Sequence, residues 1–145
     1  LGDTLMAGPE TRLVWNRIRK HLKPLHPQRI ESFCTPGFPD VEMVGCTLEL
    51  KYEKNWPKRE STKLNVDSLT KNPNQRGWWR KREKQGGRCF VLLRVADDWL
   101  LFWGVDAADY ICYSTKLELE AVAIKVWHNN LEGTELCKIL NHHRS

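Results

Sequence analysis

The stretch that decides the fold runs from Gly37 to Lys51 and reads G-F-P-D-V-E-M-V-G-C-T-L-E-L-K. After Gly45, apolar and polar residues alternate with a period of two, which is typical of a β-strand with one face toward a core. Glu49 and Lys51 therefore share the polar face of this strand. A turn at Gly45 predicts a hairpin, and Asp40, which opens the preceding strand, is expected to lie beside Glu49.

The two neighbouring carboxylates predict a cation site, because adjacent like charges repel unless a cation lies between them. Mg²⁺ suits the ligands, since it prefers carboxylate and carbonyl oxygens and keeps several waters. We expect Asp40 and Glu49 to bind it, with the backbone carbonyl of Leu50 as a further ligand. Lys51 would then orient or deprotonate the attacking water, or neutralise charge on a phosphate. An ordinary amphipathic hairpin with a charged solvent face gives the same alternation, so the spacing leaves both interpretations open.

The motif also carries a family resemblance. Pro39-Asp40, eight intervening residues and Glu49-Leu50-Lys51 resemble the signature of the PD-(D/E)XK nuclease superfamily. With Gly37 before the motif and Gln75 after it, the pattern is similar to small VRR-NUC and Holliday-junction-resolvase-like nucleases of phages and bacteria, over about residues 10 to 95. The resemblance implies an α/β fold with a restriction-endonuclease-like core, in which a mixed central sheet is flanked by helices. It also implies Mg²⁺-dependent cleavage of DNA, with Mn²⁺ as a substitute ion.

Two further catalytic candidates come from the resemblance. A first-helix glutamate often approaches the metal in related nucleases, and Glu10 matches that place. A later glutamine would hydrogen-bond the attacking water or the scissile phosphate, and Gln75 matches it. The structural alternatives are an acid that complements the helix dipole at Glu10 and a surface glutamine at Gln75.

Positive charge is concentrated directly after the motif. Residues 51 to 88 contain twelve basic and four acidic residues, whereas the chain as a whole has a net charge of +5. A segment of this kind favours an anionic polymer as partner, because neutralised phosphates release counterions. A solvated basic loop is the alternative explanation. The candidate DNA-binding residues are Lys54, Lys58, Arg59, Lys63, Arg76, Arg80 and Lys81.

Local signals predict the remaining elements. A first helix is expected from Pro9 to about Leu22, ended by Pro24, and a first strand over residues 29–34. An irregular polar loop follows over residues 52–72. A second helix is expected to start at Pro73, with Asn72 as its cap, and to end at Gly86-Gly87. Within it, Gly77 suggests close packing, and at least one of Trp78 and Trp79 should be buried.

The C-terminal half begins with a central strand over residues 89–95, a turn at Asp97-Asp98 and a strand over residues 99–103. A capping box, Thr115-x-x-Glu118, predicts a helix to about Trp127, and Thr134 is expected to cap a last helix to about Leu140. We therefore expect residues 1–145 to form one nuclease domain, with a core over about 9–104 and a helical extension over about 115–142.

Composition bounds the class of protein. The chain has 145 residues and 41% apolar content, which favours one globular domain. No apolar run or leader pattern indicates a membrane segment, so a soluble cytoplasmic protein of a bacterium or a phage-infected cell is expected. Five widely spaced cysteines favour reduced core residues over disulfides or a zinc site.

The sequence thus predicts a Mg²⁺-dependent DNA endonuclease, with branched, nicked or flapped DNA as a structure-selective substrate. The main alternative is a non-catalytic nucleic-acid-binding module derived from a nuclease fold, and a third is a basic scaffold for an acidic protein. Resolvase-like relatives are often dimers, which leaves a homodimer open.

Overall fold

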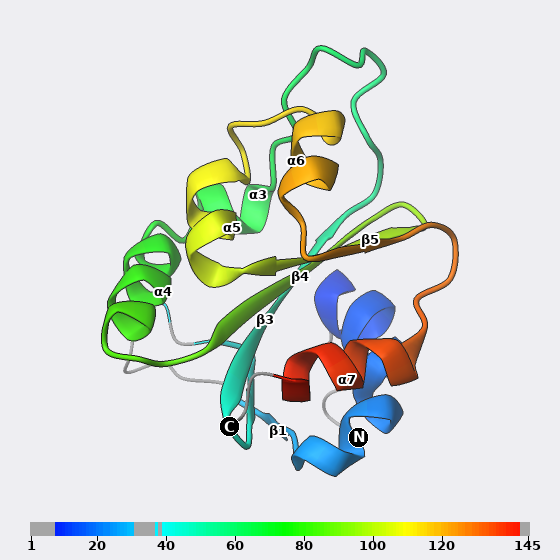
Figure 1. The fold of residues 1–145 in the computed structure, drawn as a ribbon. Helices are drawn as coiled ribbons and strands as arrows, with labels where there is room; N and C mark the ends of the chain where they lie inside the picture. The colour runs from blue at the N-terminus through cyan, green and yellow to red at the C-terminus, as the bar shows by residue number, and fades with distance from the viewer. Residues whose placement is uncertain (1–7, 31–36, 38, 143–145) are drawn as a thin grey trace.

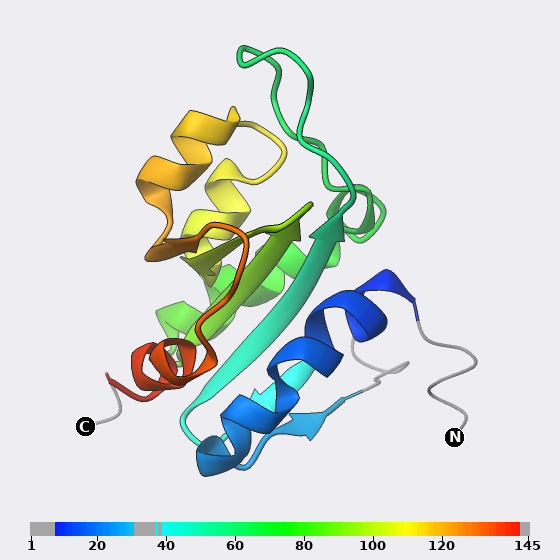
Figure 2. The same cartoon turned by 90° about the vertical axis from the view of Figure 1, so that its right-hand side faces the viewer.

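The computed structural model describes residues 8–30, 37 and 39–142, and within them six strands form one sheet in chain order (Figure 1). Neighbouring strands are antiparallel except for β3 and β4, which are parallel. Helices lie on both sides of this mixed sheet (Figure 2), so the predicted α/β class is confirmed. The strands are β1 Gln28–Arg29, β2 Val41–Met43, β3 Cys46–Glu53, β4 Cys89–Val95, β5 Asp98–Trp103 and β6 Lys125–Trp127.

The predicted hairpin is formed by β2 and β3. Gly45 adopts a φ of 90° in the turn, a left-handed conformation that glycine reaches without steric cost. Val41 pairs with Leu48, and this register brings Asp40 to the level of Glu49. β1 pairs with β2 and is shorter than the predicted first strand, most of which, including Cys34, lies outside the described residues.

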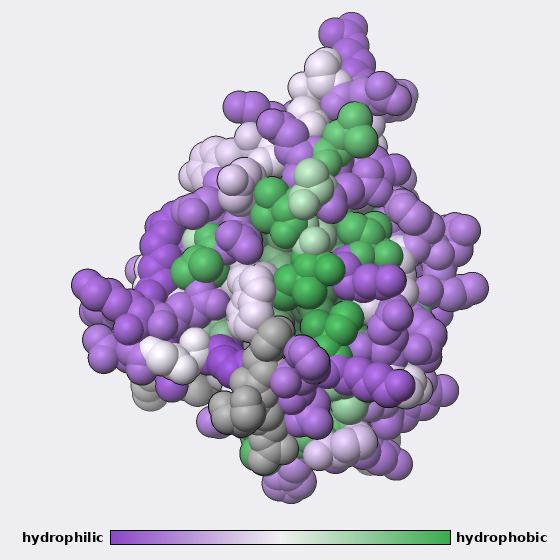
Figure 3. Space-filling view, in the orientation of Figure 1, coloured by the Kyte–Doolittle hydropathy of each residue, from purple (hydrophilic) through white to green (hydrophobic). Residues whose placement is uncertain are grey.

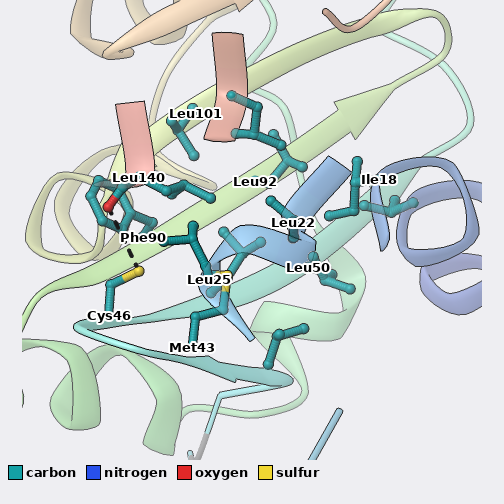
Figure 4. Close-up of a cluster of buried hydrophobic side chains, with 14 of the residues drawn as sticks. Ile18, Leu22, Leu25, Met43, Cys46, Leu50, Phe90, Leu92, Leu101 and Leu140 are labelled. Atoms are coloured by element: carbon teal, nitrogen blue, oxygen red, sulfur yellow. Dashed lines mark hydrogen bonds between the residues drawn. The ribbon is translucent and has the colours of Figure 1, made fainter. Parts of the chain in front are cut away.

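The two faces of β3 face two different hydrophobic cores. Leu48 and Leu50 point into a core that the N-terminal helical segment and α7 cover (Figure 4). The opposite face carries Thr47, Glu49 and Lys51 and lies on the side of a second core, built with α3 to α6. The polar face of the hairpin is therefore not a solvent face.

The N-terminal helical segment changes its winding along its length. It comprises η1 (Thr11–Trp15), α2 (Asn16–Ile18) and η2 (Arg19–Leu25). Pro24 lies inside η2, and the segment ends at His26, whose φ is 50°. The prediction that Pro24 stops the helix was wrong, because the φ of proline suits a terminal 3₁₀ turn.

A parallel pair of strands requires a crossover, and residues 54–88 provide it. The crossover contains α3 (Asp67–Thr70) and α4 (Asn74–Lys84). The predicted irregular loop is therefore ordered in part, and its apolar residues Leu64, Val66 and Leu69 are buried in the second core. The predicted second helix is confirmed as α4, with Trp79 fully buried and Gly86 in a left-handed conformation after its end. Asn72 does not cap it, because its side chain donates to the Ser68 carbonyl.

The C-terminal half contains α5 (Gly104–Tyr110), α6 (Lys116–Val122) and α7 (Gly133–His142). α5 was not predicted, whereas the capping box at the start of α6 is confirmed. The helix predicted to continue to Trp127 ends at Val122, because residues 125–127 pair with β5 as an edge strand. The backbone N–H groups of the first turn of α7 donate to the Glu132 carboxylate, so Thr134 is not its cap.

The C-terminal elements belong to the same sheet and the same cores as the rest of the chain. Trp127 and Leu140 are buried in the first core, and Leu119 is buried in the second. Among the described residues, no helix combines the length and the apolar character needed to cross a bilayer.

Candidate functional site

Asp40 and Glu49 lie side by side where the β2–β3 hairpin opens. The backbone N–H of Asp40 donates to Glu49 Oε1 over 3.1 Å. In return, the backbone N–H of Leu50 donates to Asp40 Oδ2 over 2.9 Å. Each carboxylate is thus bonded to the backbone of the other strand, and the predicted neighbourhood of the two acids is realised.

The second oxygen of Glu49 connects the hairpin to α4. Lys51 Nζ lies 3.0 Å from Glu49 Oε2, and Gln75 Nε2 donates to the same oxygen over 2.8 Å. Glu49 and Lys51 are each only 2% exposed, and Gln75 is 8% exposed. The three side chains form a buried polar cluster, which rules out the solvent-exposed amphipathic hairpin as an explanation of Glu49 and Lys51.

Burial and the charge of Asp40 raise the pKa of Glu49 from its ordinary value of 4.5 to about 8, although Lys51 opposes the shift. Burial is the larger cause, because the charged carboxylate loses its hydration. The metal-free carboxyl is therefore largely protonated at neutral pH. A cation that replaced this proton would stabilise the charged form, and strongly shifted pKa values of this kind gather at functional sites.

Gln75 contributes a buried acceptor that has no partner among the described residues. Its amide nitrogen is held by Glu49, whereas its Oε1 accepts no hydrogen bond within that part of the chain. An unsatisfied buried acceptor costs about 1–3 kcal/mol. A water molecule or a cation at this oxygen would remove that cost.

The oxygens of Asp40, Glu49 and Gln75 are of the chemical types that a hard divalent cation prefers, namely a small number of carboxylates together with neutral oxygens and waters. The described residues hold no group of three or more His, Cys, Asp and Glu side chains arranged to bind a metal. The site is thus limited to two carboxylates. The side chain of Leu50, whose carbonyl was predicted as a ligand, is fully buried in the first core.

Arg29 is a site residue that the sequence pattern did not reveal. Its Nη1 lies 3.4 Å from Asp40 Oδ1 and also donates to the Asp40 carbonyl, while its Nη2 donates to Thr11 Oγ1. Arg29 thereby ties the N-terminal helical segment to the site. The only available signal was its position in the strand expected before Asp40.

Glu10 contributes to the electrostatics of Glu53, at the far end of β3. Burial raises the pKa of Glu53, with contributions from the charges of Asp67 and Glu10. Glu53 lies four positions after Glu49 along β3, which corresponds to about 13 Å of extended chain. The predicted catalytic residue Glu10 is thus near Glu53, and the described hydrogen bonds and ion pairs do not link it to Asp40 or Glu49.

The predicted DNA-binding residues divide into three groups. The first four are exposed on the loop after β3, which projects beyond α6 (Figure 1): Lys54, Lys58, Arg59 and Lys63. Arg76 is committed to the fold, because it donates to the carbonyls of Ala108 and Ile111. Arg80 pairs with Asp109 over 2.7 Å, and Lys81 is exposed on α4.

Trp56, which opens the same loop, anchors it to the sheet. Its Nε1 donates to Asp98 Oδ2 over 2.8 Å, and Lys116 Nζ lies 5.2 Å from its ring centroid. Trp56 is partly buried and packs against the second core.

Comparison with known proteins gives no match to a family model, to a curated protein or to a solved structure. The geometry of this cluster is therefore the basis on which a function is proposed.

Proposed function

We propose that this chain is a Mg²⁺-dependent nuclease that hydrolyses DNA phosphodiester bonds, with Asp40 and Glu49 as metal ligands. The observation that carries the proposal is the buried cluster of Glu49, Lys51 and Gln75 beside Asp40. Burying an acid and an amine costs several kcal/mol per charge, and apolar side chains of similar size would hold a hairpin at least as well. A catalytic role explains why these residue types are present.

The order of elements supports the finer assignment to a restriction-endonuclease-like core. A helical segment precedes the β2–β3 hairpin, α4 follows it, and β4 then runs parallel to β3. The two motif acids and Lys51 lie in the hairpin, and Gln75 lies on α4. The resemblance to PD-(D/E)XK nucleases involves the same order of helix, hairpin, helix and strand.

Each side chain of the cluster has a defined task in such a reaction. When bound, the metal ion would polarise the scissile phosphate and lower the pKa of water. Lys51, held by Glu49, presents a fixed positive charge for the negative charge that develops on the phosphate. Gln75 Oε1, which has no hydrogen-bond partner among the described residues, would accept a hydrogen bond from the attacking water and so orient it. Burial of the cluster limits access of bulk water.

The test is incubation of plasmid, nicked, branched and single-stranded DNA with Mg²⁺ or Mn²⁺, compared with EDTA. Asp40→Asn and Lys51→Met preserve side-chain size while removing the charge, and we expect both to abolish cleavage with folding intact. Glu42→Gln is the matched control, because Glu42 is exposed on β2 of the same hairpin. Cleavage that survives both substitutions would refute the proposal.

A non-catalytic nucleic-acid-binding module is the second candidate, and one observation favours it. Every carboxylate oxygen of Asp40 and Glu49 already has a donor or cation of this chain within 3.4 Å. Such a module would bind DNA with strong salt dependence and would show no metal-dependent turnover.

A further inference from the structure

A groove with a volume of about 440 Å³ runs along the outer face of α4. Its described lining residues are Asn74, Gly77, Trp78, Arg80, Lys81 and Lys84. The lining combines an aromatic ring with three cations and contains no described carboxylate. In Figure 3, hydrophilic residues prevail at the left of the molecule, where α4 lies in Figure 1.

Gly77 lies in the middle of α4, where glycine weakens a helix. Apart from its chain neighbours and the backbone of its own helix, no heavy atom of the described residues lies within 4 Å of the position that a Cβ would occupy. The expectation that Gly77 allows close packing within the protein is therefore wrong. Its missing side chain leaves the helix backbone open to a ligand in the groove.

α4 connects the groove to the carboxylate site. Gln75, on the inner side of α4, bonds to Glu49, and its neighbour Asn74 lines the groove. Gly37, three residues before Asp40, packs against the same turn of α4, because a Cβ at Gly37 would lie 2.7 Å from the Asn74 carbonyl oxygen and 3.0 Å from Trp78 Cβ. The segment that leads into the hairpin thus packs against the same turn of α4 as the groove residues Asn74 and Trp78.

The three cations that line the groove differ in whether they form ion pairs within the protein. Arg80 is paired with Asp109, whereas Lys81 and Lys84 are exposed one turn apart, and no described ion pair involves them. The guanidinium of Arg82 lies 4.5 Å from the Trp78 ring centroid, and Trp78 also packs against the second core, so the ring is held in place. This combination of ring and cations suits a ligand with both phosphates and exposed bases.

We propose that this groove binds an unpaired DNA strand, with phosphates at Lys81 and Lys84 and a base against Trp78. The inference rests on the proposed nuclease function and specifies its substrate as DNA with a single-stranded segment. Base stacking on an aromatic ring requires a base that is not covered by its neighbours, and a basic groove then follows the backbone. A duplex exposes phosphates but keeps its base faces stacked.

The first experiment measures binding in EDTA, so that no cleavage occurs. Fluorescence anisotropy compares a labelled single strand of about 15 nucleotides, near the upper site size of single-strand-binding folds, with its duplex and with an abasic strand. We expect the single strand to bind most tightly. Equal affinity for the abasic strand, or tighter binding of the duplex, would overturn the proposal.

Charge variants locate the site. Lys81→Gln with Lys84→Gln is expected to lower single-strand affinity about tenfold or more and to reduce the salt slope by about 0.7 per phosphate contact. Lys20→Gln with Lys23→Gln removes the same charge from two exposed lysines of η2, which are also three residues apart, and serves as the matched control. An equal loss in both double variants would show that only overall charge matters and would reject the groove.

Gly77→Ala separates binding from folding. Alanine favours the helix, so the melting temperature is expected to rise, while the added methyl group enters the groove and lowers single-strand affinity. Unchanged affinity would contradict the proposal.

Cleavage assays separate the two proposals. Groove-dependent binding without Mg²⁺-dependent cleavage would leave the groove standing and refute the nuclease. Cleavage that is equally fast for duplex and single strand, and that the groove variants do not change, would support the nuclease and refute the groove as a single-strand site.

Discussion

At the scale of single residues, Glu49 determines the state of the candidate site. Its two oxygens accept from the Asp40 backbone and from Gln75, and Lys51 lies beside one of them. Burial nevertheless favours the protonated form, since its pKa is raised to about 8. The metal-free site is therefore neutral at Glu49, and binding of a cation would release a proton.

This pKa shift predicts a pH dependence of stability. Between about 4.5 and about 8 the folded protein holds a proton on Glu49 that the unfolded chain has lost, so stability falls as pH rises through this window. Below about pH 4.5, Glu49 is protonated in both the folded and the unfolded protein, so its titration no longer lowers stability. Glu49→Gln keeps the size and shape of the side chain but removes the group that titrates. Its melting temperature in EDTA should therefore fall less than that of the wild type between pH 5 and pH 8. Parallel curves for the two proteins would contradict the shift.

Metal binding predicts a second effect at the same residues. A ligand that binds only the folded state stabilises it by RT ln(1 + [L]/Kd), or about 2.7 kcal/mol at a hundredfold excess over Kd. Saturating Mg²⁺ or Mn²⁺ should raise the melting temperature of the wild type and of the Glu42→Gln control. Asp40→Asn should show no rise. A rise of the same size in Asp40→Asn would place the ion elsewhere.

At the scale of elements, α4 contributes residues to both the candidate site and the groove, from opposite faces. Its inner face buries Gln75 against Glu49 and Trp79 in the second core, and its outer face lines the basic groove. The loop after β3 is held in a comparable way, by Asp98 at the start of β5. The Asp98 carboxylate accepts from Trp56 and contacts His128 Nδ1 at 2.9 Å.

Asp98→Asn tests this attachment of the loop. Loss of the charged acceptor for Trp56, His128 and Lys116 is expected to lower the free energy of unfolding by about 1–3 kcal/mol in urea titrations. The neighbouring Asp97→Asn is the control, because Asp97 is 74% exposed and only approaches Arg94 at 3.4 Å. Equal destabilisation by the two substitutions would mean that Asp98 does not hold the loop.

At the scale of the whole molecule, one sheet separates two cores, and α7 closes the first of them. Leu136 and Leu140 of α7 are fully buried, and the Cys46 thiol lies 3.9 Å from the Leu140 carbonyl oxygen (Figure 4). Arg94 links β4 to the N-terminal helical segment by donating to the Leu13 carbonyl. The first and last helical parts of the chain therefore stabilise the sheet that carries the hairpin.

Leu140→Ala is expected to destabilise the protein by about 2–5 kcal/mol, because it leaves a cavity between α7 and the sheet. Leu117→Ala is the matched control, since Leu117 is 71% exposed, and it should change stability by less than about 0.5 kcal/mol. Chemical denaturation measures both. A small effect at Leu140 would mean that α7 does not contribute to the folded core.

The sequence by itself determined the local features. The alternation after Gly45 predicted the hairpin and the neighbourhood of Asp40 and Glu49, and the capping box located the start of α6. These patterns are carried by neighbouring residues, whose periodicity and hydrogen bonding a single segment specifies.

Only the tertiary structure decided which surfaces meet. It buried Glu49 and Lys51 beneath α4, engaged Arg76 with α5, turned residues 125–127 into an edge strand and placed Glu10 near Glu53. Periodicity shows that a face is polar but not what covers it. Burial and strand pairing depend on segments that are distant in the chain, so local sequence does not fix them.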